Sequence, residues 1–210
     1  MVITTKNKSA GKYNKILEAA VKVFAANGFF QSTIAQIARE AGVADGTIYL
    51  YFKNKDDILF QFFNYKTKQV FQQFSEAVEL VNHPIDKLRN LICCHLKAFQ
   101  QDRNMAILYQ TETHKYKRIA DQRIKEMSKM YLDIISDIIE QGQQEGCIRK
   151  DLYLGLVKRF IVGSVDEVIN TWLHADGQYD LVSMAEPLIE LLIRGIGSGG
   201  IEHPTSNNKN

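Results

Sequence analysis

The 210-residue chain has few residues that would interrupt helices or crosslink them. Proline and cysteine each occur three times, and Cys93, Cys94 and Cys147 show no paired spacing. An odd number of cysteines without such spacing argues against a disulfide framework or a zinc site, and it indicates thiols in a reducing compartment. Because prolines are so few, most of the chain is free to form helices.

Long hydrophobic runs are also missing. No stretch approaches the roughly 20 apolar residues that cross a bilayer, and the most apolar segments, near Ile134 and Leu188, are interrupted by acidic residues. The basic opening segment, MVITTKNKSAGKYNK, is not followed by the apolar stretch that a secretory signal requires. We therefore expect a soluble, cytoplasmic protein that does not associate with membranes.

A strong overall charge is absent, but the charge is unevenly distributed. The formal net charge is +2, yet residues 1–55 hold eight Lys or Arg against three Asp or Glu, a local balance of +5. Residues 56–210 hold 18 against 21, a balance of −3. The N-terminal quarter therefore favours an anionic partner.

Apolar residues recur at helical spacing along almost the whole chain, and no pattern typical of strands is found. The apolar content of 45% is enough for a substantial core. We predict an all-α fold in which residues 1–12 form a mobile basic arm. Helices are expected at about 13–27, 33–42, 45–52, 54–81, 85–101, 103–114, 118–145, 152–175 and 181–196.

Two of the expected helices are joined by a very short turn. Thr33 precedes Gln36 by three residues, which is the spacing of a capping box, and the apolar positions that follow end at Gly42. Beyond the turn, Ile48 and Phe52 share one face of a second short helix. A helix, a glycine turn and another helix predict a helix-turn-helix, which places its second helix in the major groove of duplex DNA.

The second helix carries more exposed apolar surface than a helix without a partner should. If Ile48 and Phe52 are buried, two tyrosines and a leucine point outward or to the flanks, which indicates a macromolecular partner. The basic side chains and helix N-termini around them suit phosphate oxygens. Ordinary packing of two short helices is the alternative interpretation. The candidate DNA contacts are Thr33, Asp45, Gly46, Thr47, Tyr49, Leu50, Tyr51, Lys53 and Lys55.

The string ILEAAVKVFAANGFFQSTIAQIAREAGVADGTIYLYFKNKDDIL resembles the DNA-binding domain of the TetR family of transcriptional regulators. The resemblance implies an all-α fold of about nine helices in two domains. Residues 1–53 would form a three-helix helix-turn-helix domain that binds DNA. Residues 54–197 would form a helical domain for ligand binding and dimerisation, and residues 198–210 would be a disordered tail.

Roles for several side chains follow from the same resemblance. It implies that Tyr51 and Lys55 bind phosphates and that Tyr49 lies near base edges. The sequence departs from the common pattern at Ala44, where a capping serine is frequent, and at Leu50, where a histidine is frequent. Leu50 is suited either to touch a thymine methyl group, which is an apolar form of base readout, or to line the groove without reading a base.

The second half of the chain is rich in methionine and aromatic residues at helical spacing. A cavity between helices is the usual ligand site of a helical domain, and such side chains adapt to the shape of an apolar ligand. Ordinary core packing would give the same pattern and is the alternative. The candidate lining residues are Leu96, Phe99, Met105, Leu108, Tyr109, Met127, Met130, Tyr131, Phe160 and Trp172.

A basic segment, residues 114–118 with further basic residues at 123 and 125, interrupts the otherwise acidic second half. One interpretation is a solvated turn between helices. The other is a site for an anionic head group at the mouth of an apolar tunnel, a polarity that acyl-coenzyme A has. Lys115, Arg118 and Arg123 are the candidates for such a contact.

The segment FIVGSVDEVINTWLHADGQYDLVSMAEPLIELLIRGI looks like the acyl-CoA-responsive fatty-acid-metabolism regulators of Gram-positive bacteria. That resemblance implies a repressor of fatty-acid degradation genes that leaves a palindromic, double-stranded DNA operator when long-chain acyl-CoA binds. It also implies a homodimer formed by the last two helices and needs no resident cofactor. A TetR-type repressor of an efflux pump that senses hydrophobic drug-like molecules is the alternative.

Two other classes of protein fit the sequence poorly. His95, His114 and His174 have no partner nucleophile or metal-ligand spacing, and no phosphate-binding loop occurs, so we expect neither an enzyme nor a metal site. A helical scaffold that binds only proteins would not explain a basic helix-turn-helix with exposed tyrosines.

Overall fold

The computed structural model describes residues 3–115 and 121–197, and within them every side chain except those of residues 3–10, 67 and 112–128. In these ranges the chain forms nine α-helices, one 3-10 helix and no strand, which confirms the all-α prediction. The helices are α1 (Ile3–Asn27), α2 (Ile34–Ala41), α3 (Asp45–Ile48), α4 (Lys55–Glu79), α5 (Pro84–Gln101), α6 (Arg103–Lys115), α7 (Asp121–Glu145), α8 (Leu154–His174), η1 (Leu181–Met184) and α9 (Ala185–Ile196).

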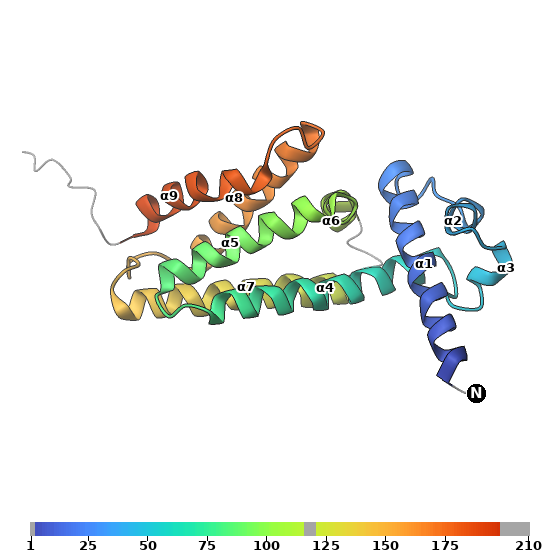
Figure 1. The fold of residues 1–210 in the computed structure, drawn as a ribbon. Helices are drawn as coiled ribbons and strands as arrows, with labels where there is room; N and C mark the ends of the chain where they lie inside the picture. The colour runs from blue at the N-terminus through green and yellow to red at the C-terminus, as the bar shows by residue number, and fades with distance from the viewer. Residues whose placement is uncertain (1–2, 116–120, 198–210) are drawn as a thin grey trace, which may run out of the picture.

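Helices α1, α2 and α3 form a small head at one end of the molecule (Figure 1). The capping box is present at the start of α2, where the Thr33 hydroxyl accepts from the Gln36 amide at 3.2 Å and the Gln36 side chain accepts from the Thr33 amide at 2.8 Å. Gly42 ends α2 in the left-handed conformation, with φ of 62°. Both signals that predicted this helix are therefore confirmed.

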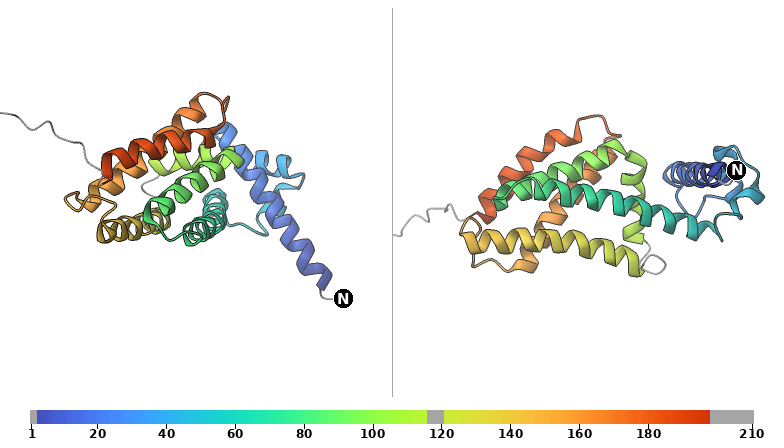
Figure 2. Two further views of the ribbon diagram at one scale, coloured as in Figure 1. Left: turned by 60° about the vertical axis from the view of Figure 1, so that its left-hand side comes forward. Right: turned by 60° about the horizontal axis from the view of Figure 1, so that its bottom comes forward.

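The prediction of a mobile arm over residues 1–12 is wrong for the part that the structure describes, because α1 begins at Ile3. The first three turns carry no apolar stripe, so periodicity could not detect them. They contain no proline, and each residue added to an existing helix gains one backbone hydrogen bond. The N-terminal part of α1 projects beyond α2 and α3 (Figure 2).

Helices α4 to α9 form the larger body. Asn54 caps α4 by accepting from the Asp57 amide at 2.8 Å. In the middle of the body, α5 packs against α4, α7, α8 and α9, and α4 and α7 run side by side (Figure 2). Leu88, Leu91 and Ile92 of α5 have no exposed surface. These buried residues place the core of the body around α5.

Most of the predicted boundaries in the body differ from the observed ones by a few residues. The helix expected over residues 181–196 is divided into η1 and α9, since Pro187 is tolerated only near a helix start, where its missing amide has no partner to lose. The predicted tail over residues 198–210 lies outside the described residues. No described helix has the length and apolar character needed to span a membrane.

Candidate functional site

Helix α3 ends at Ile48 and not at Phe52 as predicted, and Tyr49, Leu50 and Tyr51 form a turn. The helix and this turn are held to the head through one side. Ile48 and Phe52 are buried, and the Phe52 ring stacks on Tyr13 of α1 with a centroid distance of 4.9 Å. The opposite face is open to solvent, with 59% of Tyr49 and 80% of Leu50 exposed. The division into one buried and one exposed face follows the pattern read from the sequence.

The remaining candidate DNA contacts surround this exposed face. Tyr51 is half-buried because its ring meets Tyr13 edge-on at 6.5 Å, and Thr47 is half-buried as well. Ala44 precedes α3 without a side-chain cap, and Asp45 lies in the first turn, where a negative charge suits the helix dipole. The exposed candidates are Thr33, Asp45, Gly46, Tyr49, Leu50 and Lys53.

Lys55 has a role that the sequence did not indicate. Its ammonium group donates to the carbonyls of Phe29 at 2.7 Å, Phe30 at 3.2 Å and Ser32 at 2.8 Å, and it lies 4.5 Å from the centre of the Phe29 ring. A lysine has three donors, and here each has a carbonyl partner. Lys55 thus fastens the first residue of α4 to the turn before α2, and its contact with a DNA phosphate stays a prediction.

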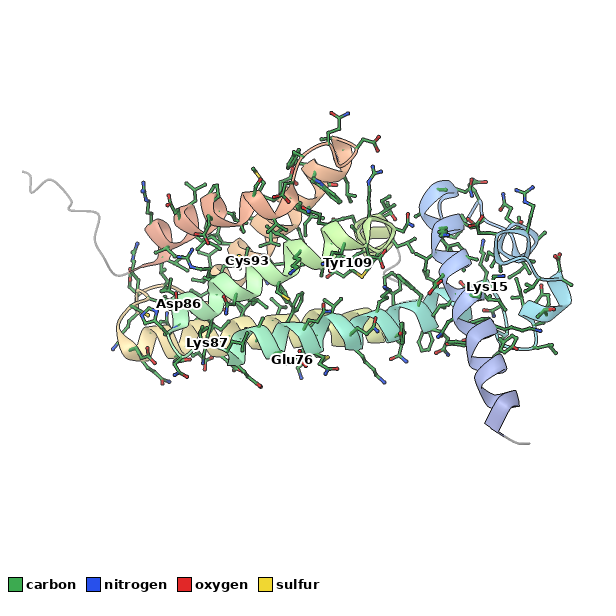
Figure 3. All side chains as sticks on the ribbon, in the orientation of Figure 1. Lys15, Glu76, Asp86, Lys87, Cys93 and Tyr109 are labelled. Atoms are coloured by element: carbon green, nitrogen blue, oxygen red, sulfur yellow. The ribbon has the colours of Figure 1, made fainter. Side chains whose placement is uncertain are left out.

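An apolar cavity lies in the body, enclosed by side chains of α4, α5, α6, α7 and α8. Its free volume in this structure is about 50 Å³, less than the roughly 300–1,000 Å³ usual for small-molecule sites, so a long ligand would require the lining side chains to move. Tyr109 lies on the side of α6 that faces this cavity (Figure 3). The lining residues are Phe63, Lys66, Val70, Phe71, Phe74, His95, Phe99, Met105, Tyr109, Tyr131, Val162 and Asp166.

Four of the residues predicted from the sequence line this cavity: Phe99, Met105, Tyr109 and Tyr131. Five others lie elsewhere. Leu96, Leu108 and Trp172 are buried in the core on other faces of their helices, and Met130 and Phe160 are about half exposed at the surface. Arg118 lies outside the described residues, as do the side chains of Lys115, Arg123 and Met127.

Helix α4 contributes to the cavity wall, which was not predicted from the sequence. Four apolar residues of this helix line the cavity: Phe63, Val70, Phe71 and Phe74. Successive members are seven, one and three residues apart, which places them on one side of the helix. The sequence shows that residues 58–74 are rich in aromatic side chains, but apolar spacing alone does not show whether such a stripe borders a cavity or solid core. His95, for which the sequence indicated no catalytic or metal-binding role, is a lining residue as well.

The wall of the cavity contains a neutral polar pair. His95 Nδ1 and the Tyr131 hydroxyl oxygen share a hydrogen bond of 2.9 Å, and the His95 ring also meets Phe74 and Phe99. Burial lowers the pKa of His95 from 6.5 to about 3 and raises the pKa of Tyr131 well above its usual value. Both side chains are therefore uncharged at neutral pH, which suits an apolar ligand.

Helices α8 and α9 expose apolar side chains on their outer faces. On α8, Leu156 and Phe160 are exposed and Gly163, one turn further on, has no neighbour that would touch an added Cβ. Leu191 of α9 is 71% exposed. Among the residues that the structure describes, no group of three or more His, Cys, Asp or Glu could hold a metal ion.

Comparisons with known proteins match nearly the whole chain. A family model described as "Bacterial regulatory proteins, tetR family" matches residues 16–62, and one described as "YsiA-like protein, C-terminal region" matches residues 63–195. The chain is 41% identical over 185 residues to the fatty acid metabolism regulator protein of Bacillus subtilis (strain 168), covering 88% of this chain and 95% of that protein.

Solved structures show the same similarity. The transcriptional regulator FadR from Bacillus subtilis in complex with stearoyl-CoA superimposes with a TM-score of 0.81 at 41% identity, covering 88% of this chain and 99% of that one. The fatty acid degradation regulator FadR from Bacillus halodurans also gives a TM-score of 0.81, at 34% identity and over 91% and 97% of the two chains. Head and body are therefore both shared with these proteins.

Proposed function

The chain belongs to the TetR family of bacterial regulatory proteins, and from this premise we propose that it represses fatty-acid degradation genes until long-chain acyl-CoA binds. The observation that carries the proposal is the apolar cavity of the body, which lies in the same chain as a helix-turn-helix with an exposed second helix. The similar FadR of Bacillus subtilis, solved with stearoyl-CoA, supports this choice of effector. The protein would act in the cytoplasm, without a resident cofactor and without catalysis.

DNA binding is assigned to the exposed face of α3 and the residues that follow it. Tyr49 and Leu50 would read base edges, and Leu50 has the apolar surface to meet a thymine methyl group. Thr47 and Tyr51 lie beside them, and Thr33 presents the N-terminus of α2 to the phosphates.

A homodimer is assigned to the apolar surface of α8 and α9. Leu156, Phe160 and Gly163 follow one another at helical spacing on the exposed side of α8, and Leu191 adds to this surface from α9. Pairing of the two helices with their copies would bury this surface in a four-helix bundle. A twofold dimer would bind a palindromic operator whose half-sites are about 34 Å apart.

The effector is assigned to the cavity, with its acyl chain against the aromatic residues of α4, α5 and α6. The neutral His95–Tyr131 pair presents no charge to such a chain. The head group would lie outside the apolar part of the cavity. Lys115, Arg118 and Arg123 remain our candidates for its phosphates.

The test is operator binding measured with and without effector. Fluorescence anisotropy with DNA fragments from upstream of the protein's own gene and of fatty-acid degradation genes should find a site bound at nanomolar protein. Stearoyl-CoA should release that DNA, whereas coenzyme A alone should not. Release by a panel of hydrophobic drugs but not by stearoyl-CoA would favour the efflux-pump alternative. Failure to bind any fragment from low to physiological salt would reject the proposal.

A further inference from the structure

Lys66, in the middle of α4, lies where two hollows meet. It lines the apolar cavity, and it also lines a polar cleft between α1, α4 and α6 whose other residues include Glu18, Lys22 and Gln69. Among the described lining residues of the cavity, Lys66 is the cation. A ligand with an apolar chain in the cavity and a polar end would meet this ammonium group where the apolar wall ends.

The partner of Lys66 is Asp102, which joins α4 to the start of α6. One carboxylate oxygen of Asp102 lies 2.7 Å from the Lys66 ammonium nitrogen. The other accepts from the Met105 amide at 3.0 Å and so caps the first turn of α6. Met105 itself lines the cavity, so a single carboxylate connects a cavity wall, the start of α6 and the middle of α4.

The elements joined by this ion pair are the ones on which the head rests. Helix α1 packs against both α4 and α6, and its residues Leu17 and Val21 line the polar cleft together with Lys66 and Asp102. A change in how α4 and α6 are held together at this point therefore reaches α1 directly, without passing through the rest of the body.

We propose that Lys66 binds an oxygen acceptor at the polar end of an acyl ligand, exchanging Asp102 for that acceptor and releasing α6 from α4. The inference rests on the proposed function and adds to it the residue that senses the ligand. Asp102 and the acceptor compete for one ammonium group, so the ligand favours the arrangement in which the ion pair is broken. The ion pair in turn favours the arrangement that binds DNA.

Four variants test this assignment. K66M removes the cation and keeps the length of the side chain, and K66R keeps the charge. D102N removes the negative charge but keeps a good N-cap for α6, because asparagine caps helices about as well as aspartate. The matched control is D176N, which removes the neighbouring ion pair between Arg103 and Asp176 at a position of positive φ that asparagine accepts. Thermal unfolding checks that each variant is folded.

The measurements are the affinity for operator without effector and the affinity for stearoyl-CoA and stearate, with the single tryptophan as a probe. K66M should bind stearoyl-CoA at least about tenfold more weakly, the loss expected for a charge-assisted hydrogen bond, and K66R should bind it more tightly than K66M. Without effector, the affinity of D102N for operator should be lower by at least about fivefold. Its affinity for stearoyl-CoA should be at least that of the unchanged protein. D176N should match the unchanged protein in both.

If K66M binds stearate more weakly, the group recognised is the carbonyl end of the acyl chain. If K66M binds only stearoyl-CoA more weakly and stearate as before, the groups recognised are the phosphates. Both outcomes support the role of Lys66. Unchanged stearoyl-CoA affinity in K66M, or unchanged operator affinity in D102N, would overturn it. If stearoyl-CoA fails to bind the unchanged protein, the proposed function and this assignment both fail. If it releases the unchanged protein and the variants alike, only this assignment fails.

Discussion

At the scale of single residues, His95 makes stability depend on pH. Its pKa is about 3 in the folded protein against an ordinary 6.5, so the unfolded state takes up the proton first as the pH falls. The stabilising effect of the neutral form is complete above pH about 6.5 and declines by about 1.4 kcal/mol per pH unit below it. We expect the free energy of unfolding to fall by about 2 kcal/mol from this residue between pH 7 and pH 5, measured by urea denaturation.

The control for this prediction is His95→Gln, which keeps an acceptor near the Tyr131 hydroxyl but does not titrate. This variant should be less stable at pH 7 and should lose less stability on acidification. An equally steep decline in both proteins would show that other groups cause the pH dependence.

Leu50 allows a second prediction at this scale. With 80% of its side chain exposed, Leu50→Ala removes almost no packing, so the melting temperature should stay within about a degree or two of the original. Operator affinity should fall by about tenfold, with reduced discrimination at one base pair, because the shortened side chain no longer reaches a base edge. Anisotropy titrations with operators substituted one base pair at a time provide the measurement. Equal affinity across that set would remove Leu50 from the interface.

Single residues also show which contacts can be predicted from the sequence and which cannot. The burial of Ile48 and Phe52 was predictable because both lie on the same apolar side of a short segment with a defined start, and only that side can pack against the head. The hydrogen bonds of Lys55 were not predictable, since its three carbonyl partners come from a turn more than twenty residues earlier. For the cavity, periodicity identified apolar faces but not which of them borders a hollow, so Phe99 was found together with the core residue Leu96.

At the scale of elements, the early start of α1 has a testable effect on DNA binding. The first seventeen residues contain four lysines and no acidic residue. Lys15, the last of them, has its ammonium group next to Gly42 in the turn of the helix-turn-helix. In the sequence of α1, Lys8, Lys12 and Lys15 recur at spacings of four and three residues, which are helical spacings. Lys8→Gln with Lys12→Gln should weaken binding to all duplexes by a similar factor and lower the salt slope by about 0.9 for each phosphate that is no longer neutralised.

The matched change is Lys22→Gln, which lies on the same helix and is paired with Glu40. It should leave the salt slope unchanged. If the double variant keeps the original slope, the N-terminal turns of α1 do not meet DNA phosphates.

The elements that the sequence predicted best were those with a chemical signal at an end. Asn54 before α4 and the capping box before α2 mark helix starts by satisfying amides that have no helical partner. The start of α1 carries no such signal, and η1 and α9 were merged because their apolar spacing continues through the bend. Helix ends without caps are set by packing, which a single sequence does not display.

At the scale of the whole molecule, the exposed surface of α8 and α9 predicts the oligomeric state. Phe160→Glu together with Leu191→Glu places charge on a surface that would be desolvated in a dimer, so the protein should become a monomer in sedimentation equilibrium. Operator affinity should fall by at least about a hundredfold, because the two heads then bind separately. Leu80→Glu is the control, since Leu80 is 80% exposed at the end of α4, outside both helices. A dimer that persists in the double variant would place the interface elsewhere.

The three hydrogen bonds of Lys55 connect the N-terminal end of α4 to the turn before α2. At 25 residues, α4 is about 37 Å long, its middle borders the cavity, and its first residue holds the head through three hydrogen bonds. A tilt of about 5° of α4 about its C-terminal end would move the Lys55 end by about 3 Å. This displacement is nearly the rise of roughly 3.4 Å between base pairs of DNA. In the proposed twofold dimer the two displacements would add, so a ligand-induced tilt of α4 would move the two copies of α3 out of register with DNA by more than one base pair.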